Sequence, residues 1–259
     1  MYGYWHSVRE NFNFSRSEVS QIFWTSLAFG FALSFRKWGT GDTVDVPVGI
    51  VNLLFATAVV LLCMYIHVSL QKLVAIKLGY KAVYSYWLNG VLFTIFLAFL
   101  SFGYVAFVLP GAVTIEQVPR LRLGKFRYGL NLKDIARIAL AGPVAHILIV
   151  LMLGPIFFAT GRNEVLLSII IVNLLLAIYS ILPVPKIDVP SKMDSGSDGL
   201  GLFFFSRTLY VLVFVTIVVF VGLVLSSANT VGMGWLFIIA FAIGCIFAFF
   251  YRISLEQKN

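Results

Sequence analysis

Residues 48–66 read VGIVNLLFATAVVLLCMYI, an unbroken apolar stretch without a single charged side chain. A helix that crosses the hydrocarbon core of a bilayer needs about 20 predominantly apolar residues. The stretch has this length and composition, and the segment 67–72, which contains His67, Gln71 and Lys72, follows it directly. We therefore predict a transmembrane helix at 48–66.

Runs of the same kind recur along the whole chain. Of its 259 residues, 60% are hydrophobic and 12% are charged, and the mean hydropathy is +0.96, far outside the range of soluble domains. The apolar runs lie at 21–35, 48–66, 91–109, 135–160, 165–182, 209–226 and 231–251. They leave no room for a soluble domain of the usual size, about 100 residues or more. We predict one membrane domain at 21–259, preceded by a polar N-terminal arm at 1–20.

The basic residues predict how these runs cross the membrane, because cytoplasmic loops are enriched in lysine and arginine. Seven simple crossings would place the basic loops before and after 91–109 on opposite faces. If 91–109 instead enters and leaves by the same face, only Arg36, Lys37 and Arg162 of the 19 basic residues lie outside. We therefore predict an all-α protein of the cell membrane, with six transmembrane helices, a re-entrant segment and both termini in the cytoplasm.

The re-entrant segment contains the helix-breaking residues that such a path requires. Ser101, Gly103, Pro110 and Gly111 lie within it or at its end. Non-helical backbone at membrane depth occurs only where protein or a water-filled cavity satisfies its polar groups. We therefore expect a cavity beside this segment.

Several other classes of protein are disfavoured. The basic residues are scattered among loops and form no stripe with interleaved aromatic residues, so we expect no nucleic-acid partner. The sequence shows no repeat of 20–50 residues and no mirrored hydropathy, which disfavours an inverted-repeat transporter. Both cysteines, Cys63 and Cys245, lie inside apolar runs, as small buried residues do.

Three short motifs occur in an order and spacing that match one membrane family. Residues 67–79 read HVSLQKLVAIKLG, similar to H-E-x-x-H-x-L-V-A-x-x-x-G, and residues 140–146 read LAGPVAH, similar to A-G-P-x-x-N. NLLLA at 173–177, LPVP at 182–185 and the dipeptide Asp198-Gly199 match N-L-x-x-A, L-P-x-P and D-G. Over about 48–207 the chain thus resembles the site-2 proteases, which are intramembrane zinc metalloproteases. This resemblance implies their helical core.

The departures from the family pattern concern its chemistry. In the intact motif, two histidines four residues apart bind zinc, and the glutamate after the first is the general base. His67 is present here, but Val68 occupies the position of the base and Gln71 that of the second ligand. Valine cannot take up a proton, and a neutral amide is a much poorer zinc ligand than imidazole. We expect zinc binding to be weak or absent, and Lys72 to extend to the cytoplasmic interface.

The position of the third zinc ligand has two candidates. Counting onward from the L-P-x-P match without a gap gives Asp188, whereas Asp198 keeps the Asp-Gly dipeptide after an insertion. We favour Asp198. His146 replaces the asparagine of the second motif, and with His67 and an aspartate it would complete a rearranged three-ligand site.

The resemblance also implies a groove that receives a segment of a membrane-spanning protein. We expect Pro110, Gly111 and Asn173 to lie along this groove. Because the base and the second ligand are missing, we expect a non-catalytic homologue that binds transmembrane or membrane-associated client segments. The two alternatives are an active intramembrane zinc metalloprotease with a rearranged site, and a small-solute or ion pathway. The expected partners are membrane lipid and a client protein.

Overall fold

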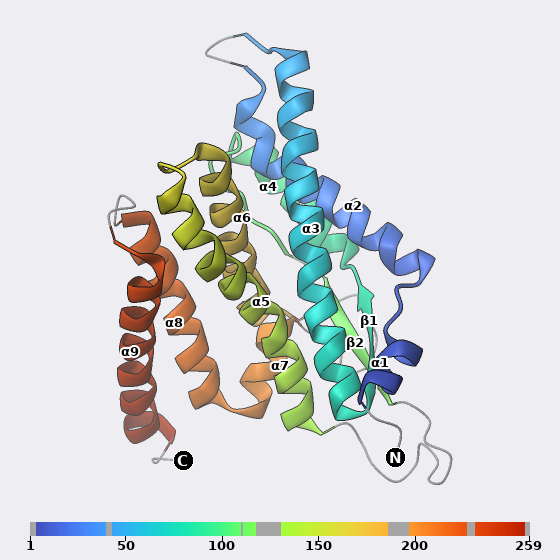
Figure 1. Cartoon of the computed structure of the whole chain (residues 1–259), viewed down its shortest axis with the longest axis vertical. Coiled ribbons are helices and arrows are strands. Elements are labelled where there is room, and N and C mark those ends of the chain that lie inside the picture. The colour runs from blue at the N-terminus through green and yellow to red at the C-terminus, as the bar shows by residue number, and fades with distance from the viewer. Residues whose placement is uncertain are drawn as a thin grey trace.

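The computed structural model describes residues 4–39, 43–109, 111–117, 131–185, 197–226 and 231–256. Most of these residues are helical (Figure 1). In chain order the elements are α1 (Tyr4–Asn11), α2 (Arg16–Ser34), η1 (Phe35–Lys37), α3 (Val46–Leu78), β1 (Tyr80–Ser85), α4 (Leu88–Leu100), β2 (Ala112–Gln117), α5 (Leu132–Ala159), α6 (Glu164–Ile181), α7 (Asp198–Phe205), α8 (Arg207–Ser226), α9 (Met233–Tyr251) and the π-helical turn η2 (Arg252–Glu256).

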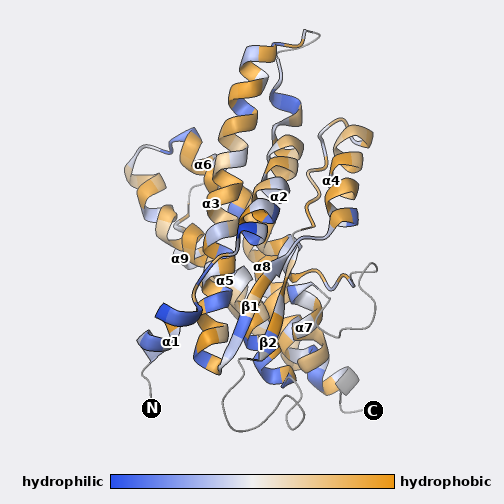
Figure 2. Cartoon of the chain, turned by 90° about the vertical axis from the view of Figure 1, so that its right-hand side faces the viewer, coloured by the Kyte–Doolittle hydropathy of each residue, from blue (hydrophilic) through white to orange (hydrophobic). Residues whose placement is uncertain are grey.

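Five helices in the described part of the chain are long and apolar enough to cross a membrane, namely α3, α5, α6, α8 and α9. The apolar helix α4 is shorter, with 13 residues. The run at 21–35 lies in α2, which begins with polar residues and is not one of these five. Figure 2 shows hydrophobic residues along the helices and hydrophilic residues on α1. The chain is therefore built as a membrane protein.

The expectation of an entirely helical protein needs one correction, because β1 and β2 form a two-stranded antiparallel sheet. Tyr80 pairs with Gln117, and Ser85 pairs with Ala112. Aromatic and β-branched residues such as Tyr84 and Val113 are common in these strands and favour extended backbone. The sheet brings together the two ends of the segment that contains α4, so this segment begins and ends at the same place in the fold.

The chain reverses direction immediately after α4. Phe102 and Gly103 have φ angles of 50° and 73°, and the left-handed region is readily adopted by glycine. The Arg36 guanidinium lies 4.0 Å from the centre of the Tyr104 ring, so the turn packs against the C-terminal end of α2. From this turn the chain continues to Leu109 without regular secondary structure. Pro110 lies outside the described residues.

Helix α3 carries the first sequence motif on a rigid element. It has 33 residues and continues well past the apolar run that ends at residue 66. The Asp45 carboxylate accepts a hydrogen bond of 3.2 Å from the Val48 N–H at its start. Gly79 ends the helix with a φ of 87°, a left-handed conformation that favours glycine. His67 and Gln71 therefore lie one turn apart on the same face of one helix.

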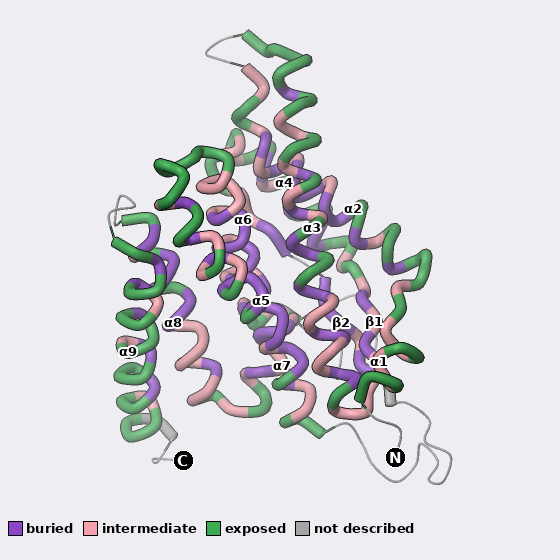
Figure 3. Tube along the Cα trace, viewed as in Figure 1, coloured by how far each residue is buried: buried purple, intermediate pink, exposed green. Residues whose placement is uncertain are grey.

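Three apolar cores join the elements, and buried residues concentrate where α3, α5 and α6 meet (Figure 3). The largest core connects α5, α6 and α7 with the α8–α9 pair. A second lies among α2, α3, α4 and α6 and includes Val68 and Tyr84. The third lies where the sheet packs against the ends of α3 and α5. The motif residues are thus placed where all three cores adjoin.

Candidate functional site

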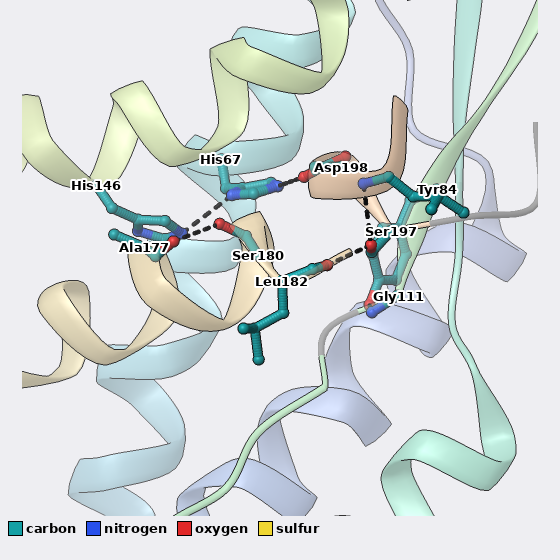
Figure 4. Close-up of polar contacts among 10 residues, drawn as sticks. His67, Tyr84, Gly111, His146, Ala177, Ser180, Leu182, Ser197 and Asp198 are labelled. Atoms are coloured by element: carbon teal, nitrogen blue, oxygen red, sulfur yellow. Dashed lines mark hydrogen bonds and ion pairs between the residues drawn. The ribbon is translucent and has the colours of Figure 1, made fainter. Parts of the chain in front are cut away.

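Three of the predicted site residues meet in one buried cluster. His67 of α3, His146 of α5 and Asp198 of α7 are 3%, 0% and 7% exposed. Nδ1 of His67 lies 3.0 Å from Nε2 of His146, and Nε2 of His67 lies 3.2 Å from Oδ2 of Asp198 (Figure 4). Asn173 of α6 extends this cluster, because its Oδ1 lies 3.0 Å from Nδ1 of His146. We call Asn173, His146, His67 and Asp198 the polar network.

The Asn173 amide determines the direction of the hydrogen bonds. Its Nδ2 donates to the Ile169 carbonyl over 2.9 Å, so its Oδ1 accepts from Nδ1 of His146. A neutral His146 then has only its Nε2 lone pair left to accept the proton on Nδ1 of His67. One proton therefore lies between His67 and Asp198, either on an imidazolium that donates to a carboxylate or on a carboxylic acid that donates to neutral His67.

The residues of the polar network are brought together by close backbone packing at Gly142 and Gly199. A Cβ atom on Gly142 of α5 would overlap the His67 ring, so only glycine lets α5 approach α3 this closely. A Cβ atom on Gly199 of α7 would overlap the carbonyl oxygen of Ile181 at the end of α6. Steric crowding therefore explains why the A-G-P and D-G motifs have glycine at these two positions.

Ser197 holds the start of α7, and with it Asp198, against the end of α6. Its Oγ donates to the Leu182 carbonyl and accepts the Val184 N–H over 2.9 Å (Figure 4). Its own N–H donates to the Val184 carbonyl over 3.0 Å. These bonds connect the L-P-x-P segment to the Asp-Gly dipeptide. The alternative candidate Asp188 lies outside the described residues.

The residues present do not fit the catalytic zinc that the resemblance implies. A catalytic zinc site needs three protein ligands, and the motif positions supply the imidazole of His67 and the carboxylate of Asp198, with the neutral amide of Gln71 in place of the second imidazole. Val68 is completely buried in an apolar core. Among the residues that the structure describes, no group of three or more histidine, cysteine or acidic side chains is arranged to hold a metal ion. The cluster is arranged as a hydrogen-bonded network.

A short groove with a volume of about 30 Å³ lies beside Asp198, between β2, α5 and α7. Its lining includes Val113 and Ile115 of β2, Ile138 of α5, and Asp198 and Phe204 of α7. In the described part of the chain, β2 has a strand partner on one side only. The groove is therefore lined by a strand that has a partner on one side and by a buried carboxylate.

The outer edge of β1, by contrast, is occupied by side chains of α2. The Tyr84 N–H donates to Oε1 of Glu18 over 2.8 Å, and the Tyr86 N–H donates to Oε1 of Gln21 over 3.0 Å. Unpaired edge groups of a strand are the groups that bind a further strand. Among the described residues, β2 is therefore the strand whose outer edge has neither a strand nor these α2 side chains as partners.

The structure describes two of the three residues expected along a client groove. Gly111 lies at the base of β2, and its N–H donates to the Tyr84 hydroxyl over 3.3 Å (Figure 4). Asn173 is completely buried behind His146 and belongs to the polar network. Pro110 is outside the described residues.

The cavity expected beside the re-entrant segment has a counterpart between α2 and α4. This cleft has a volume of about 820 Å³. Ser17, Ser20 and Gln21 line its polar end, and Phe31 and Ile95 line its apolar part. It is separate from the groove beside Asp198.

The expectation for Lys72 was wrong, and its partner was missed. Lys72 is 2% exposed and does not reach the interface. Its Nζ lies 2.7 Å from Oε1 of Glu18, donates to the Asn13 carbonyl over 2.7 Å and lies 4.4 Å from the centre of the Phe14 ring. The capping-box spacing of Ser15 and Glu18 marks the start of α2, but it carries no signal for the contact with Lys72.

Comparison of the chain with models of known protein families, with curated proteins and with solved structures finds no match.

Proposed function

We propose that this chain is a non-catalytic membrane protein with a site-2-protease-like core that binds an extended segment of a client protein in the groove along β2. The observation that carries the proposal is the use of both His67 nitrogens within the polar network. In this arrangement His67 is hydrogen-bonded on both sides, and Val68 cannot act as a base. Zinc, where it binds at all, binds weakly.

The groove supports a binding role. A strand edge binds an extended peptide through main-chain hydrogen bonds, while neighbouring pockets accept alternate side chains. β2 has such an edge, and Ile138 and Phe204 form apolar walls near it. The client segment is therefore an unwound part of a transmembrane or membrane-associated chain, which supplies both backbone groups and apolar side chains.

The proposed arrangement in the cell membrane has six crossings, formed by the five long apolar helices and α2. The segment that contains α4 is re-entrant, and both termini are cytoplasmic. The support comes from the distribution of basic residues, with only Arg36, Lys37 and Arg162 outside, and from the pairing of Tyr80 with Gln117. The sheet, α7 and the groove then lie at the cytoplasmic side.

The test is site-specific photocrosslinking in nanodiscs. The photoreactive residue p-benzoylphenylalanine replaces Phe204, which lines the groove and is 59% exposed, or the control Phe241 of α9, which is 48% exposed. The probe is a synthetic transmembrane peptide of leucine and alanine with a central Gly-Pro break. We expect crosslinks from position 204, few from position 241, and no cleavage of the peptide.

Two outcomes would overturn the proposal. Equal crosslinking from both positions would mean that the peptide contacts the protein nonspecifically. Cleavage of the peptide that disappears in His67→Ala would identify an active protease, and zinc close to one atom per chain would accompany it.

A further inference from the structure

The cleft between α2 and α4, about 820 Å³ in volume, has no part in the proposed client groove. The α2 residues that line it run from Ser17 to Phe31 along one side of the helix. The step from position 17 to position 31 corresponds to about 21 Å along the helix axis. The cleft is therefore long and narrow, with a mean cross-section of about 40 Å².

The shape and lining of this cleft restrict what can occupy it. A helix with its side chains is about 10–12 Å wide and has a cross-section of about 80–110 Å², so a transmembrane helix does not fit. An extended peptide would leave backbone groups without partners, because α2 and α4 bond their own and Glu18 and Gln21 hold the outer edge of β1. Apolar walls such as Phe31 and Ile95 do not hold water. A hydrocarbon chain is narrow enough and needs no hydrogen bonds, and the bilayer supplies it.

The two ends of the cleft differ in polarity, as the two parts of a lipid do. At the polar end, Nε2 of Gln21 donates to Oγ of Ser17 over 3.0 Å, which leaves the Ser17 O–H for a further acceptor. The ester carbonyl of a lipid is such an acceptor. Trp24 lines the next turn, and tryptophan is enriched at the level where headgroups meet acyl chains.

Arg16 supplies a positive charge at the polar end. It lies one turn before Ser20 on the same side of α2 and is exposed. Within the described residues it forms no ion pair with an acidic side chain, and the neighbouring Glu18 is paired with Lys72. An arginine at the mouth of an apolar cleft is complementary to the phosphate of a lipid whose chain enters the cleft.

We propose that the cleft between α2 and α4 binds one membrane phospholipid, whose acyl chain lies along Trp24 to Phe31 and whose phosphate is bound by Arg16. The polar end adjoins β1, because Tyr86 lines the cleft and its N–H donates to Gln21. In the proposed arrangement the lipid therefore belongs to the cytoplasmic leaflet. The bound chain fills the space that the side chains of α2 and α4 leave between them.

The experiment counts the lipid molecules that each chain retains in mild detergent, by native mass spectrometry with dioleoylphosphatidylglycerol as the probe. Ile95→Trp fills the cleft, whereas Leu92→Trp adds the same side chain at a 54% exposed position of α4 outside the lining. We expect the parent and Leu92→Trp to retain one lipid. Ile95→Trp should bind it roughly tenfold more weakly, because the added side chain takes the place of the acyl chain.

A second pair of variants tests the phosphate contact without changing the packing. Arg16→Gln and the control Arg9→Gln each remove one exposed basic side chain, and Arg9 lies on α1, outside the lining. Arg16→Gln should bind the lipid roughly fivefold more weakly, the effect of about one arginine near a phosphate, and Arg9→Gln should bind it as the parent does. Dioleoylglycerol has the same chains without the phosphate, and the parent should bind it as weakly as Arg16→Gln binds the phospholipid.

Four other results would each contradict the inference. Equal retention by Ile95→Trp and Leu92→Trp would place the lipid elsewhere on the protein. Binding of dioleoylglycerol as tight as that of the phospholipid would rule out the phosphate contact. Release of the lipid by the leucine–alanine peptide would make the cleft a client site, and a parent that retains a second copy of the chain but no lipid would make it a dimer interface. The proposed function is tested separately, by crosslinking from position 204.

Discussion

The ion pair between Glu18 and Lys72 is the most strongly buried pair of opposite charges in the described part of the chain. Burial alone would raise the pKa of Glu18, but hydrogen bonds from Lys72 and from the N–H groups of Ser15 and Tyr84 outweigh it. They hold the pKa of this carboxyl below its ordinary value of 4.5. The pair thus joins the start of α2 to both α3 and β1.

Removing one partner of this ion pair should destabilise the protein more than removing both. Lys72→Met leaves an uncompensated buried carboxylate, and we expect it to lower the free energy of unfolding by about 3–5 kcal/mol. Glu18→Gln combined with Lys72→Met should recover much of this loss. Thermal unfolding in one detergent measures both variants. If the double variant is as unstable as Lys72→Met, the loss of stability in Lys72→Met does not come from leaving the Glu18 carboxylate without a positively charged partner.

The pair also predicts a dependence on pH. Because the pKa of Glu18 is lowered in the folded protein, its contribution to stability is present above pH 4.5 and is lost as the pH falls through the lowered value. The difference in stability between the parent and the double variant should therefore shrink on acidification.

At the scale of elements, the position of α7 decides whether Asp198 reaches His67. This helix has only eight residues, too few to be stable by itself. It is held by Ser197 and by the close approach of Gly199 to the Ile181 carbonyl. Asp198 is therefore positioned by packing of α7 against the end of α6.

Two glycines of α7 provide a matched test of this packing. Gly199→Ala should displace α7, lowering the free energy of unfolding by about 1–3 kcal/mol, as overpacking does, and abolishing crosslinking from position 204. A Cβ atom on Gly201 would stand 3.3 Å from Cγ2 of Ile135 and 3.6 Å from Cβ of Ala139. Gly201→Ala should change stability by less than about 1 kcal/mol, since alanine also favours the helix. Equal effects of the two changes would contradict the steric argument.

At the scale of the whole molecule, the sheet holds together the two ends of the segment that contains α4. Lys81 and Glu116 are cross-strand partners, and the segment between them includes α4 and its reversal at Gly103. Helix α1 and the C-terminal end of α9 lie at the same end of the molecule (Figure 1). The architecture thus has one end that carries the sheet, α7 and the ends of the first and last helices.

This arrangement predicts which residues share a side of the membrane. In a variant with Cys63 and Cys245 replaced by serine, Lys81→Cys and Glu116→Cys should react with a membrane-impermeant maleimide from the cytoplasmic side. Glu164→Cys, at the exposed start of α6, should react from the opposite side. Cell labelling before and after permeabilisation measures all three. Reaction of positions 81 and 116 from opposite faces would restore a simple crossing at 91–109.

The sequence by itself determined the membrane class and much of the candidate site. Apolar runs are local, so the five long helices follow from composition alone. The motif spacing pointed to His67, His146 and Asp198, and the structure brings these three together. The D-G dipeptide marked Asp198 through its match to the family motif, and the structure gives the reason for the glycine, since a Cβ atom on Gly199 would overlap the Ile181 carbonyl.

Tertiary structure alone decided which polar groups found partners. Lys72 and Glu18 are 54 positions apart, and nothing in the sequence between them predicts that they meet, because burial of a charge depends on which helices pack together. The sheet was missed for the same reason, since β1 and β2 pair across an intervening helix. Gln71 appeared in the sequence only as a lost zinc ligand, and the structure buries its amide against α5 without a hydrogen-bond partner among the described residues. Local composition encodes the elements, whereas contacts between distant residues arise only when the cores assemble.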